Sequence, residues 1–156
     1  MFKFLTSSRP AGSELPSPDG RYVARLGSPQ EVWGNYLADL ALWTTGPAPR
    51  LLYHRAGYQA HFLPPSTPDE LIFGYWTPDS KWLVFYEFKR QETYQLAFID
   101  VPAGQVYRVP ASDELLNQLP TLAGSSAALE ARLPALQPSA GPLPTDAVAT
   151  AELRPR

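Results

Sequence analysis

Residues 77–86 read Thr-Pro-Asp-Ser-Lys-Trp-Leu-Val-Phe-Tyr, and residues 17–26 read Ser-Pro-Asp-Gly-Arg-Tyr-Val-Ala-Arg-Leu. In each stretch a Ser/Thr-Pro-Asp turn precedes a run of β-prone residues. Proline fixes φ at the second turn position, while Asp favours the third position and Gly the fourth. A third copy of the turn, Thr-Pro-Asp-Glu, occupies residues 67–70. A repeated turn followed by a strand predicts repeated sheet units.

The segments around these turns predict an antiparallel sheet protein. About seven strands are expected, over 21–26, 36–44, 50–54, 71–76, 81–88, 94–101 and 105–109. Leucine and alanine within 36–44 favour helix, which is the alternative for that segment. The turn at 77–80 joins the strands on either side of it into a hairpin with a four-residue loop.

The strand over 81–88 has two apolar faces. Trp82 and Val84 fall on one face, and Leu83 and Phe85 on the other, because successive side chains of a strand point in opposite directions. A strand that is apolar on both faces is expected in the middle of a sheet, covered on two sides.

The chain changes composition after Tyr107, its last aromatic residue, and is then mainly Ala, Leu, Pro and Ser. Ser112 is a candidate cap for a helix with acidic residues in its first turn. The apolar side of that helix is expected to hold Leu115, Leu116, Leu119 and Leu122. A second short helix is expected over 126–133, stopped by Pro134. The predicted organisation is a lead-in at 1–14, a β-repeat domain at 15–110, a helical appendage at 111–134 and a disordered tail at 135–156.

Residues 70–109 resemble a WD40-like repeat of the TolB type, which is one four-stranded blade of a β-propeller. In that family an aromatic residue and a Ser/Thr-Pro-Asp-Gly/Ser turn join the first two strands, as residues 76–80 would here. An apolar second strand follows, and the third strand ends near an Asp, matched by Asp100. Residues 15–54 repeat the pattern less completely. Members of this family commonly serve as binding platforms or as covering domains on peptidases.

Two blades are too few for a closed propeller, which typically has 4–8. The expected fold is therefore mainly β: two blade-like antiparallel β-sheets, as a partial propeller or a sandwich, with one or two short C-terminal helices. Three arrangements would cover the exposed sheets: an open sandwich of the blades, packing of the C-terminal helices, or association of copies as a homo-oligomer. A propeller fragment completed by another chain is a further alternative.

The composition argues against several classes of protein. Thirteen Lys and Arg against fifteen Asp and Glu give a net charge of −2, so no nucleic-acid partner is indicated. Absence of cysteine excludes disulfides, thiolate nucleophiles and thiolate-bound metals. No run approaches the roughly 18 apolar residues of a membrane span, and residues 1–10 lack the apolar core of a signal peptide. A soluble, cytoplasmic protein of bacterial type with no membrane partner is the expectation.

Few residues have the arrangement that is found in catalytic or metal sites. Asp19, Asp69 and Asp79 could form a carboxylate cluster, but each is better explained by its own Pro-Asp turn. His54 and His61 are the only histidines, and a metal site usually needs three or four convergent ligands. The sequence contains no nucleophile elbow and no phosphate-binding glycine loop. We expect no enzyme activity, no cofactor and no metal.

If each blade has four antiparallel strands, three connections are expected at the same edge of the blades: 27–35, 55–66 and 88–93. Aromatic residues and Arg in adjoining loops are typical of protein-recognition surfaces. The candidate partner-binding residues are Trp33, Tyr58, His61, Phe62, Arg90 and Glu92. The alternative is that Trp33 and Phe62 only plug the ends of the sheets.

The function predicted from these features is non-enzymatic protein binding by a module that neutralises or docks a single partner protein. The alternative, from a different class, is an accessory or degenerate enzyme domain that binds a small molecule or a metal near His54 and His61.

Overall fold

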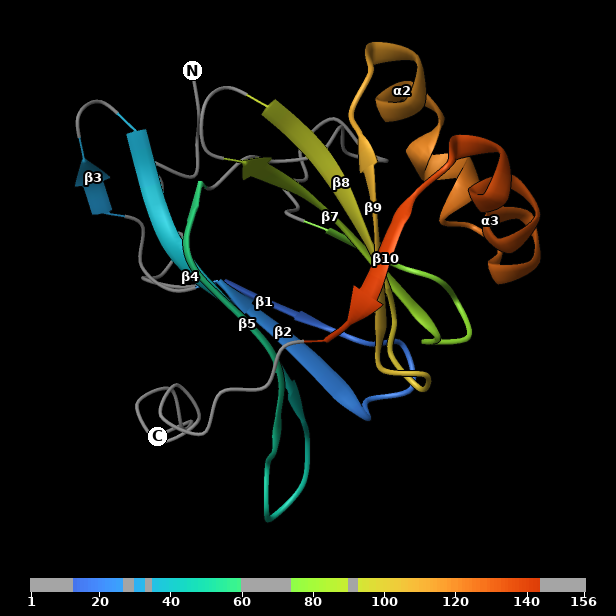
Figure 1. Cartoon of the computed structure of the whole chain (residues 1–156). Coiled ribbons are helices and arrows are strands. Elements are labelled where there is room, and N and C mark those ends of the chain that lie inside the picture. The colour runs from blue at the N-terminus through green and yellow to red at the C-terminus, as the bar shows by residue number, and fades with distance from the viewer. Residues whose placement is uncertain (1–12, 27–29, 33–34, 60–73, 90–92, 144–156) are drawn as a thin grey trace. The chain divides into compact units, whose positions relative to one another are not determined.

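The computed structural model describes residues 13–26, 30–32, 35–59, 74–89 and 93–143. The chain forms two compact units, Met1–Ala60 with Pro144–Arg156, and His61–Leu143. Each unit holds a five-stranded antiparallel sheet (Figure 1), and the second also holds two short helices. The prediction of a mainly β chain with two blade-like antiparallel sheets and short C-terminal helices is confirmed. No helix within the described ranges is long and apolar enough to cross a membrane.

The first unit is a meander built around one long strand. Its strands are β1 (Ser13–Pro16), β2 (Tyr22–Leu26), β3 (Gln30–Val32), β4 (Asn35–Thr44) and β5 (Leu51–Gln59). On one side of β4, Leu26 of β2 pairs with Leu40 and Gln30 of β3 pairs with Leu37. On the other side, β4 pairs with β5. Thus β2 and β3 follow one another along β4 as one interrupted strand.

The pairing extends strands into segments that the sequence predicts as loops. The segment 27–35 contains β3, and the segment 55–66 begins inside β5, which ends at Gln59. Ser13 and Glu14, expected in the lead-in, pair with β2 as part of β1. These predictions are wrong because the backbone of a long partner strand recruits neighbours whose own composition does not favour a strand. The helix alternative for 36–44 is also wrong, since β4 spans it.

The second unit repeats the meander and adds one strand. Its strands are β6 (Gly74–Trp76), β7 (Trp82–Lys89), β8 (Thr93–Asp100), β9 (Gln105–Pro110) and β10 (Ser139–Pro142). Strands β6 to β9 neighbour each other in chain order, and β10 pairs with the other side of β9. The middle strand is β8, so β7 is not the centre of the sheet, although it has a neighbour on each side.

The helices begin at serine caps. They are α2 (Asp113–Leu122), α3 (Ser126–Arg132) and the 3-10 helix η1 (Leu133–Leu136). The Ser112 hydroxyl accepts a hydrogen bond from the Leu115 amide at 3.1 Å, as predicted. The Ser125 hydroxyl accepts one from the Ala128 amide at 3.2 Å. Each cap satisfies an amide that has no partner inside its helix.

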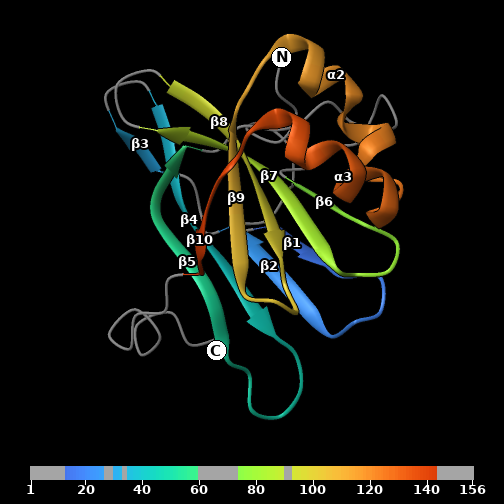
Figure 2. The ribbon, with the colours of Figure 1, turned by 45° about the vertical axis from the view of Figure 1, so that its right-hand side comes forward.

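The helices cover one face of the second sheet (Figure 2). The shared core consists of Trp82, Val84, Leu96, Phe98 and Val109 from the strands, with Leu115, Leu119, Leu129 and Leu133 from the helices. Leu116 and Leu122 pack against this core while partly exposed. The predicted amphipathic pattern of α2 is therefore confirmed, as is the arrangement in which C-terminal helices cover a sheet.

The opposite face of β7 is buried as well. Leu83 is 2% exposed and Phe85 is 0% exposed. Because Trp82 and Val84 lie in the core on the helix side, both faces of this strand are buried over 82–85. The sequence prediction of a strand covered on two sides is confirmed.

A disordered tail from residue 135 is expected from the sequence, and residues 135–143 contradict it. Leu136 ends η1, and Ser139–Pro142 forms β10. The Leu143 amide also donates to the Gly104 carbonyl at 2.9 Å. Composition fails as a guide here because an exposed sheet edge offers hydrogen-bonding groups to a small-residue segment that has little β propensity of its own. The rest of the expected tail, 144–156, lies outside the described residues.

The Pro-Asp turn of the first unit is held by side-chain hydrogen bonds. The Gly20 amide donates to the Ser17 carbonyl at 2.9 Å, which closes the turn. The Ser17 hydroxyl donates to Asp19 at 2.8 Å and accepts from the Tyr22 amide at 3.0 Å. The Arg21 amide donates to the same Asp19 oxygen at 3.0 Å. The carboxylate is therefore used by its own turn.

The turn of the second unit has the same hydrogen bonds. The Ser80 amide donates to the Thr77 carbonyl at 2.9 Å. The Thr77 hydroxyl donates to Asp79 at 2.7 Å and accepts from the Trp82 amide at 3.0 Å. The Lys81 amide donates to Asp79 at 3.1 Å. The prediction that these aspartates stabilise their turns is confirmed for both copies, and Asp69 lies outside the described residues.

Candidate functional site

The second unit contains a pocket of about 320 Å³ near the end of its sheet. The strands and the turn contribute Lys81, Trp82, Asp100 and Tyr107, and the helical segment and the residue before β10 contribute Glu130, Leu133, Pro134 and Pro138. The lining thus combines two aromatic rings, three charged groups and three apolar side chains. All these residues belong to the second unit.

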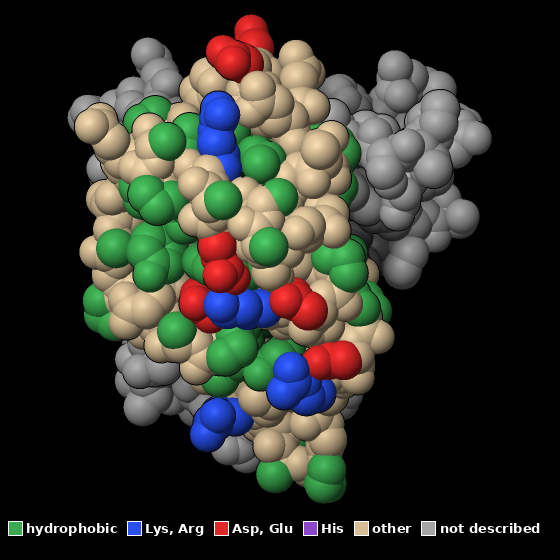
Figure 3. Space-filling model, turned by 90° about the vertical axis from the view of Figure 1, so that its right-hand side faces the viewer, with side chains coloured by type: hydrophobic (Ala, Val, Ile, Leu, Met, Phe, Trp, Pro, Cys, Tyr) green, Lys and Arg blue, Asp and Glu red, His purple; other side chains and the backbone are tan. Residues whose placement is uncertain are grey.

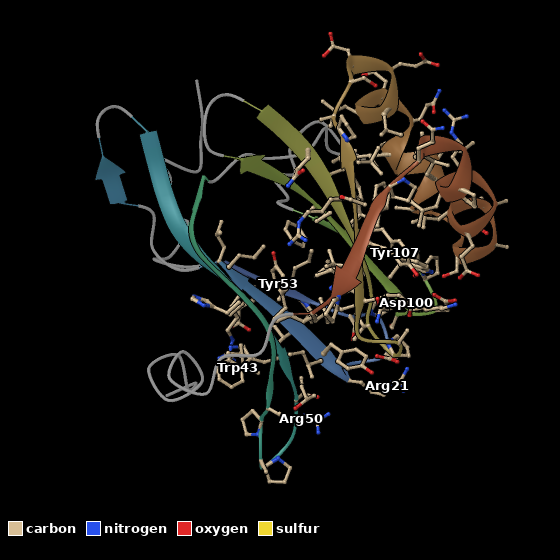
Figure 4. All side chains as sticks on the ribbon, viewed as in Figure 1. Arg21, Trp43, Arg50, Tyr53, Asp100 and Tyr107 are labelled. Carbon is tan, nitrogen blue, oxygen red and sulfur yellow. The ribbon has the colours of Figure 1, made fainter. Side chains whose placement is uncertain are left out.

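The strand register brings the polar and aromatic sides of the pocket together. Trp82 on β7 is paired directly with Asp100 on β8, and directly paired residues project to the same face of a sheet. Tyr107 lies on β9, two residues after Gln105, the partner of Asp100. Figure 4 shows Asp100 and Tyr107 in this part of the second unit.

Two aromatic rings form one wall. The ring centroids of Trp82 and Tyr107 lie 5.7 Å apart with an interplanar angle of 46°, which is a favourable separation for an aromatic pair. The Lys81 ammonium lies 5.7 Å from the centroid of the Trp82 ring, within cation–π range. In the first unit, Arg21 lies 5.4 Å from the Tyr22 ring at the equivalent place after the turn.

Glu130 joins helix α3 to the sheet. Its Oε2 accepts from Lys81 Nζ at 2.8 Å and from Trp82 Nε1 at 2.8 Å. The hydrogen bond from Lys81, and then that from Trp82, lowers the pKa of the Glu130 carboxyl below its ordinary value. The hydrogen bond to Glu130 in turn raises the pKa of Lys81. Both groups are therefore charged at neutral pH.

A second contact attaches α3 to the turn beneath the pocket. The Ser126 hydroxyl donates to Asp79 at 2.6 Å. This bond is the main cause that lowers the pKa of Asp79, and the hydroxyl of Thr77 contributes next. Figure 3 shows acidic and basic side chains next to one another, among apolar ones, on the face that carries the helices.

Asp100 differs from the other carboxylates of this site. Its Oδ1 accepts one long hydrogen bond, from the Ala103 amide at 3.3 Å. Within the described part of the chain, its side chain forms no ion pair at 4.0 Å or less. Asp100 is half-buried, so the pocket contains a carboxylate with capacity to accept further hydrogen bonds.

The structure does not test the binding edge predicted from the loops. Trp33, His61, Phe62, Arg90 and Glu92 all lie outside the described residues. Tyr58 lies in β5, and its side chain is likewise outside the description. The six residues stay a prediction.

His54 lies on β5 opposite Ala41, which is also paired with Arg25. Among the described residues its buried Nε2 has no hydrogen-bond partner; the buried Nε of Arg25 has none either, although it lies 3.7 Å from Glu14 Oε1. Among the described residues no three His, Cys, Asp or Glu side chains are grouped so as to hold a metal ion. His61, the other half of the predicted accessory site, is outside the described residues.

Sequence reasoning did not identify the pocket. It assigned Trp82 to the core and Lys81 to the start of the strand over 81–88, and gave Glu130 no role. Lys81 and Glu130 are 49 positions apart, and no motif in either segment signals the contact. The available signal was the repeat itself, because Arg21-Tyr22 and Lys81-Trp82 place a cation before an aromatic residue at the same point after each turn.

Comparison of the chain with protein-family models, with curated proteins and with solved structures finds no match.

Proposed function

We propose that this chain is a non-enzymatic protein-binding module that docks a single partner protein through the pocket of its second unit. The observation that carries the proposal is the pocket wall, where the partly exposed Tyr107, backed by the buried Trp82, lies beside the charged groups of Lys81, Asp100 and Glu130. Aromatic anchors and a few placed polar groups are typical of recognition pockets. The walls come from strands and helices that share one core, so little ordering is needed when a partner binds.

The charge states favour binding over acid–base chemistry. A general acid or base works best when its pKa is near the operating pH. The pKa values of Asp79 and Glu130 are lowered and that of Lys81 is raised. Each shift moves the pKa further from neutral pH. They act as fixed charges that hold the helices and the sheet together.

We also propose that the two units are divergent copies of a TolB-type blade. Both turns carry the same set of side-chain hydrogen bonds, and both units are antiparallel sheets in which the strand after the turn pairs with a strand that follows it. The helices and β10 are then an addition to the second blade. This relationship supports a scaffold role, because such blades commonly serve as binding platforms.

The proposal is tested by identifying the partner with the tagged full chain and measuring its affinity for variants. Asp100→Lys introduces a bulky cation at the pocket, and Asp113→Lys makes the same charge change at the exposed start of α2. Asp100→Lys should weaken binding by at least about tenfold, or 1.4 kcal/mol. Asp113→Lys should leave affinity and the circular dichroism spectrum unchanged.

Three results would count against the proposal. Equal weakening by both variants would indicate a general charge effect instead of docking at the pocket. Loss of binding in Trp33→Ala with full affinity in Asp100→Lys would move the site to the predicted loops. A stoichiometric metal or small molecule in the purified chain, with no protein partner, would favour the accessory enzyme alternative.

A further inference from the structure

We infer that the pocket of the second unit, on the premise of the proposed function, receives an arginine side chain of the partner protein. The pocket is lined by two carboxylates and one ammonium group, so its fixed charge is negative. A ligand group of positive charge is therefore favoured over an anion or a neutral group of the same size.

The carboxylate that would accept the ligand is Asp100. Glu130 Oε2 already accepts from Lys81 Nζ and Trp82 Nε1. Among the described residues, the Asp100 carboxylate accepts only the 3.3 Å bond from the Ala103 amide. The pocket thus contains one engaged carboxylate and one that can still accept two hydrogen bonds from a planar donor.

The aromatic wall selects for a planar cation. The partly exposed ring of Tyr107 lines the pocket beside Asp100, and the buried Trp82 backs it with ring centroids 5.7 Å apart. A guanidinium group stacks on aromatic rings and binds a carboxylate through two parallel N–H donors, whereas an ammonium group does neither as well. Lys81 over Trp82 and Arg21 over Tyr22 show that each unit places a cation against an aromatic ring at this point.

The apolar side of the pocket suits the stem of the same residue. Leu133, Pro134 and Pro138 line the pocket together with the aromatic pair. The methylene groups of a long basic side chain pack on such surfaces while the charged head reaches a polar partner. A pocket with a carboxylate on one wall and prolines on another matches the two chemical parts of arginine.

The probe is the blocked tripeptide acetyl-Gly-Arg-Gly-amide, titrated to about 10 mM into the ¹⁵N-labelled full chain. The indole N–H resonance of Trp82, assigned with Trp82→Phe, and the backbone resonances of Lys81 and Asp100 report on the pocket. We expect saturable shifts of these resonances that weaken as salt is added. The matched peptide carries citrulline, which has the shape of arginine without its charge, and should bind at least about tenfold more weakly.

Variants separate the pocket from general charge attraction. Asp100→Asn should weaken the arginine peptide by at least about tenfold, while Asp113→Asn should bind it as the unmodified chain does. Circular dichroism spectra of both variants should match the unmodified chain, which shows that the fold is kept.

The outcomes distinguish the inference from the proposed function. Equal binding of the citrulline peptide, or of acetyl-Gly-Leu-Gly-amide, would overturn the arginine assignment and leave a docking pocket in place. Full arginine binding by Asp100→Asn would also overturn it. Absence of any shift at the pocket with every peptide would overturn the inference. The proposed function would then be decided separately, by whether the captured partner binds Asp100→Lys more weakly than it binds the unmodified chain.

Discussion

Ser126, the first residue of helix α3, donates a hydrogen bond to Asp79 across 47 positions of sequence at 2.6 Å. Asp79 belongs to the turn before β7, and its counterpart in the first unit is Asp19. The Asp19 carboxylate accepts a hydrogen bond from Arg21 Nε at 2.5 Å, and Arg21 is only two residues away. The same turn position therefore has a local cation as its partner in one unit and a distant helix in the other.

Removing the serine hydroxyl should change the titration of Asp79. The Ser126 hydroxyl is the main group that lowers the pKa of Asp79, so Ser126→Ala should raise that pKa toward its ordinary value. The measurement is the ¹³C shift of the Asp79 carboxyl as a function of pH. Ser125→Ala is the matched control, because it removes the neighbouring cap and should leave Asp79 nearly unchanged. A pKa that does not rise in Ser126→Ala would contradict the contact.

The Lys81–Glu130 pair should make stability depend on pH at both ends of the range. The folded-state pKa of Glu130 is lowered from 4.5, so its contribution is present above that value and is lost as pH falls through the lower folded value. The folded-state pKa of Lys81 is raised from 10.5, so its contribution is present below that value and is lost as pH rises through the higher folded value.

Urea unfolding of Glu130→Gln beside the unmodified chain checks this dependence. The variant should have a lower urea midpoint between about pH 5 and 9, and the difference should shrink toward about pH 3. Added salt should also reduce the difference, because the pair is partly exposed. Glu114→Gln, whose carboxylate accepts from Gln118 on the same helix, should show a smaller effect. A constant difference at all pH values would argue against an ionic contribution.

Glycine at the end of the first turn should favour the left-handed backbone conformation there, which Ser80 adopts in the second turn with φ of +64°. Gly20 has φ of +77° and no atom within 4 Å of the position of an added Cβ. Gly20→Ala should therefore cost about 1 kcal/mol through the left-handed conformation alone, with no steric clash. Gly141→Ala in β10 also meets nothing within 4 Å and has no such φ, so its free energy of unfolding should change by less. Similar losses in both variants would mean that the turn conformation is not the cause.

The free energy of unfolding should be more sensitive to truncation of Phe85, on the buried face of β7, than to truncation of Leu116. Its side chain is fully buried, and truncation of such a side chain typically costs about 3–5 kcal/mol. Phe85→Ala should lower the urea midpoint strongly. Leu116→Ala, on the partly exposed side of α2, should cost less. An unchanged midpoint in Phe85→Ala would show that this face of the sheet contributes little to stability.

The role of β10 is tested by two truncations. A chain that ends at Leu143 keeps β10, whereas a chain that ends at Gln137 loses its pairing with β9, the Leu143–Gly104 hydrogen bond and Pro138 of the pocket. The shorter chain should melt at least about 3 °C below the longer one, since each kcal/mol corresponds to a few degrees in a chain of this size. Equal melting temperatures would mean that β10 contributes nothing to stability.

Local patterns of the sequence predicted much of the fold. The two turns, the strands that follow them and the cap of α2 all depend on interactions within a few residues. Examples are Ser17 with Asp19, Thr77 with Asp79 and Ser112 with Leu115. Alternation of side chains also predicted the two buried faces of β7. These features are readable because backbone propensity, turn chemistry and side-chain direction are set by neighbouring residues.

The sequence by itself determined the repeated turn-and-strand units, the mainly β class and the amphipathic helix α2. Only the tertiary structure decided that Ser139–Pro142 becomes a strand, that α3 joins the β7 turn through Asp79 and Glu130, and that a pocket forms between them. The physical reason is that these contacts pair groups 31 to 49 positions apart. Edge hydrogen bonds and ion pairs carry no periodic pattern in either partner, so they become visible only when folding brings the two segments together.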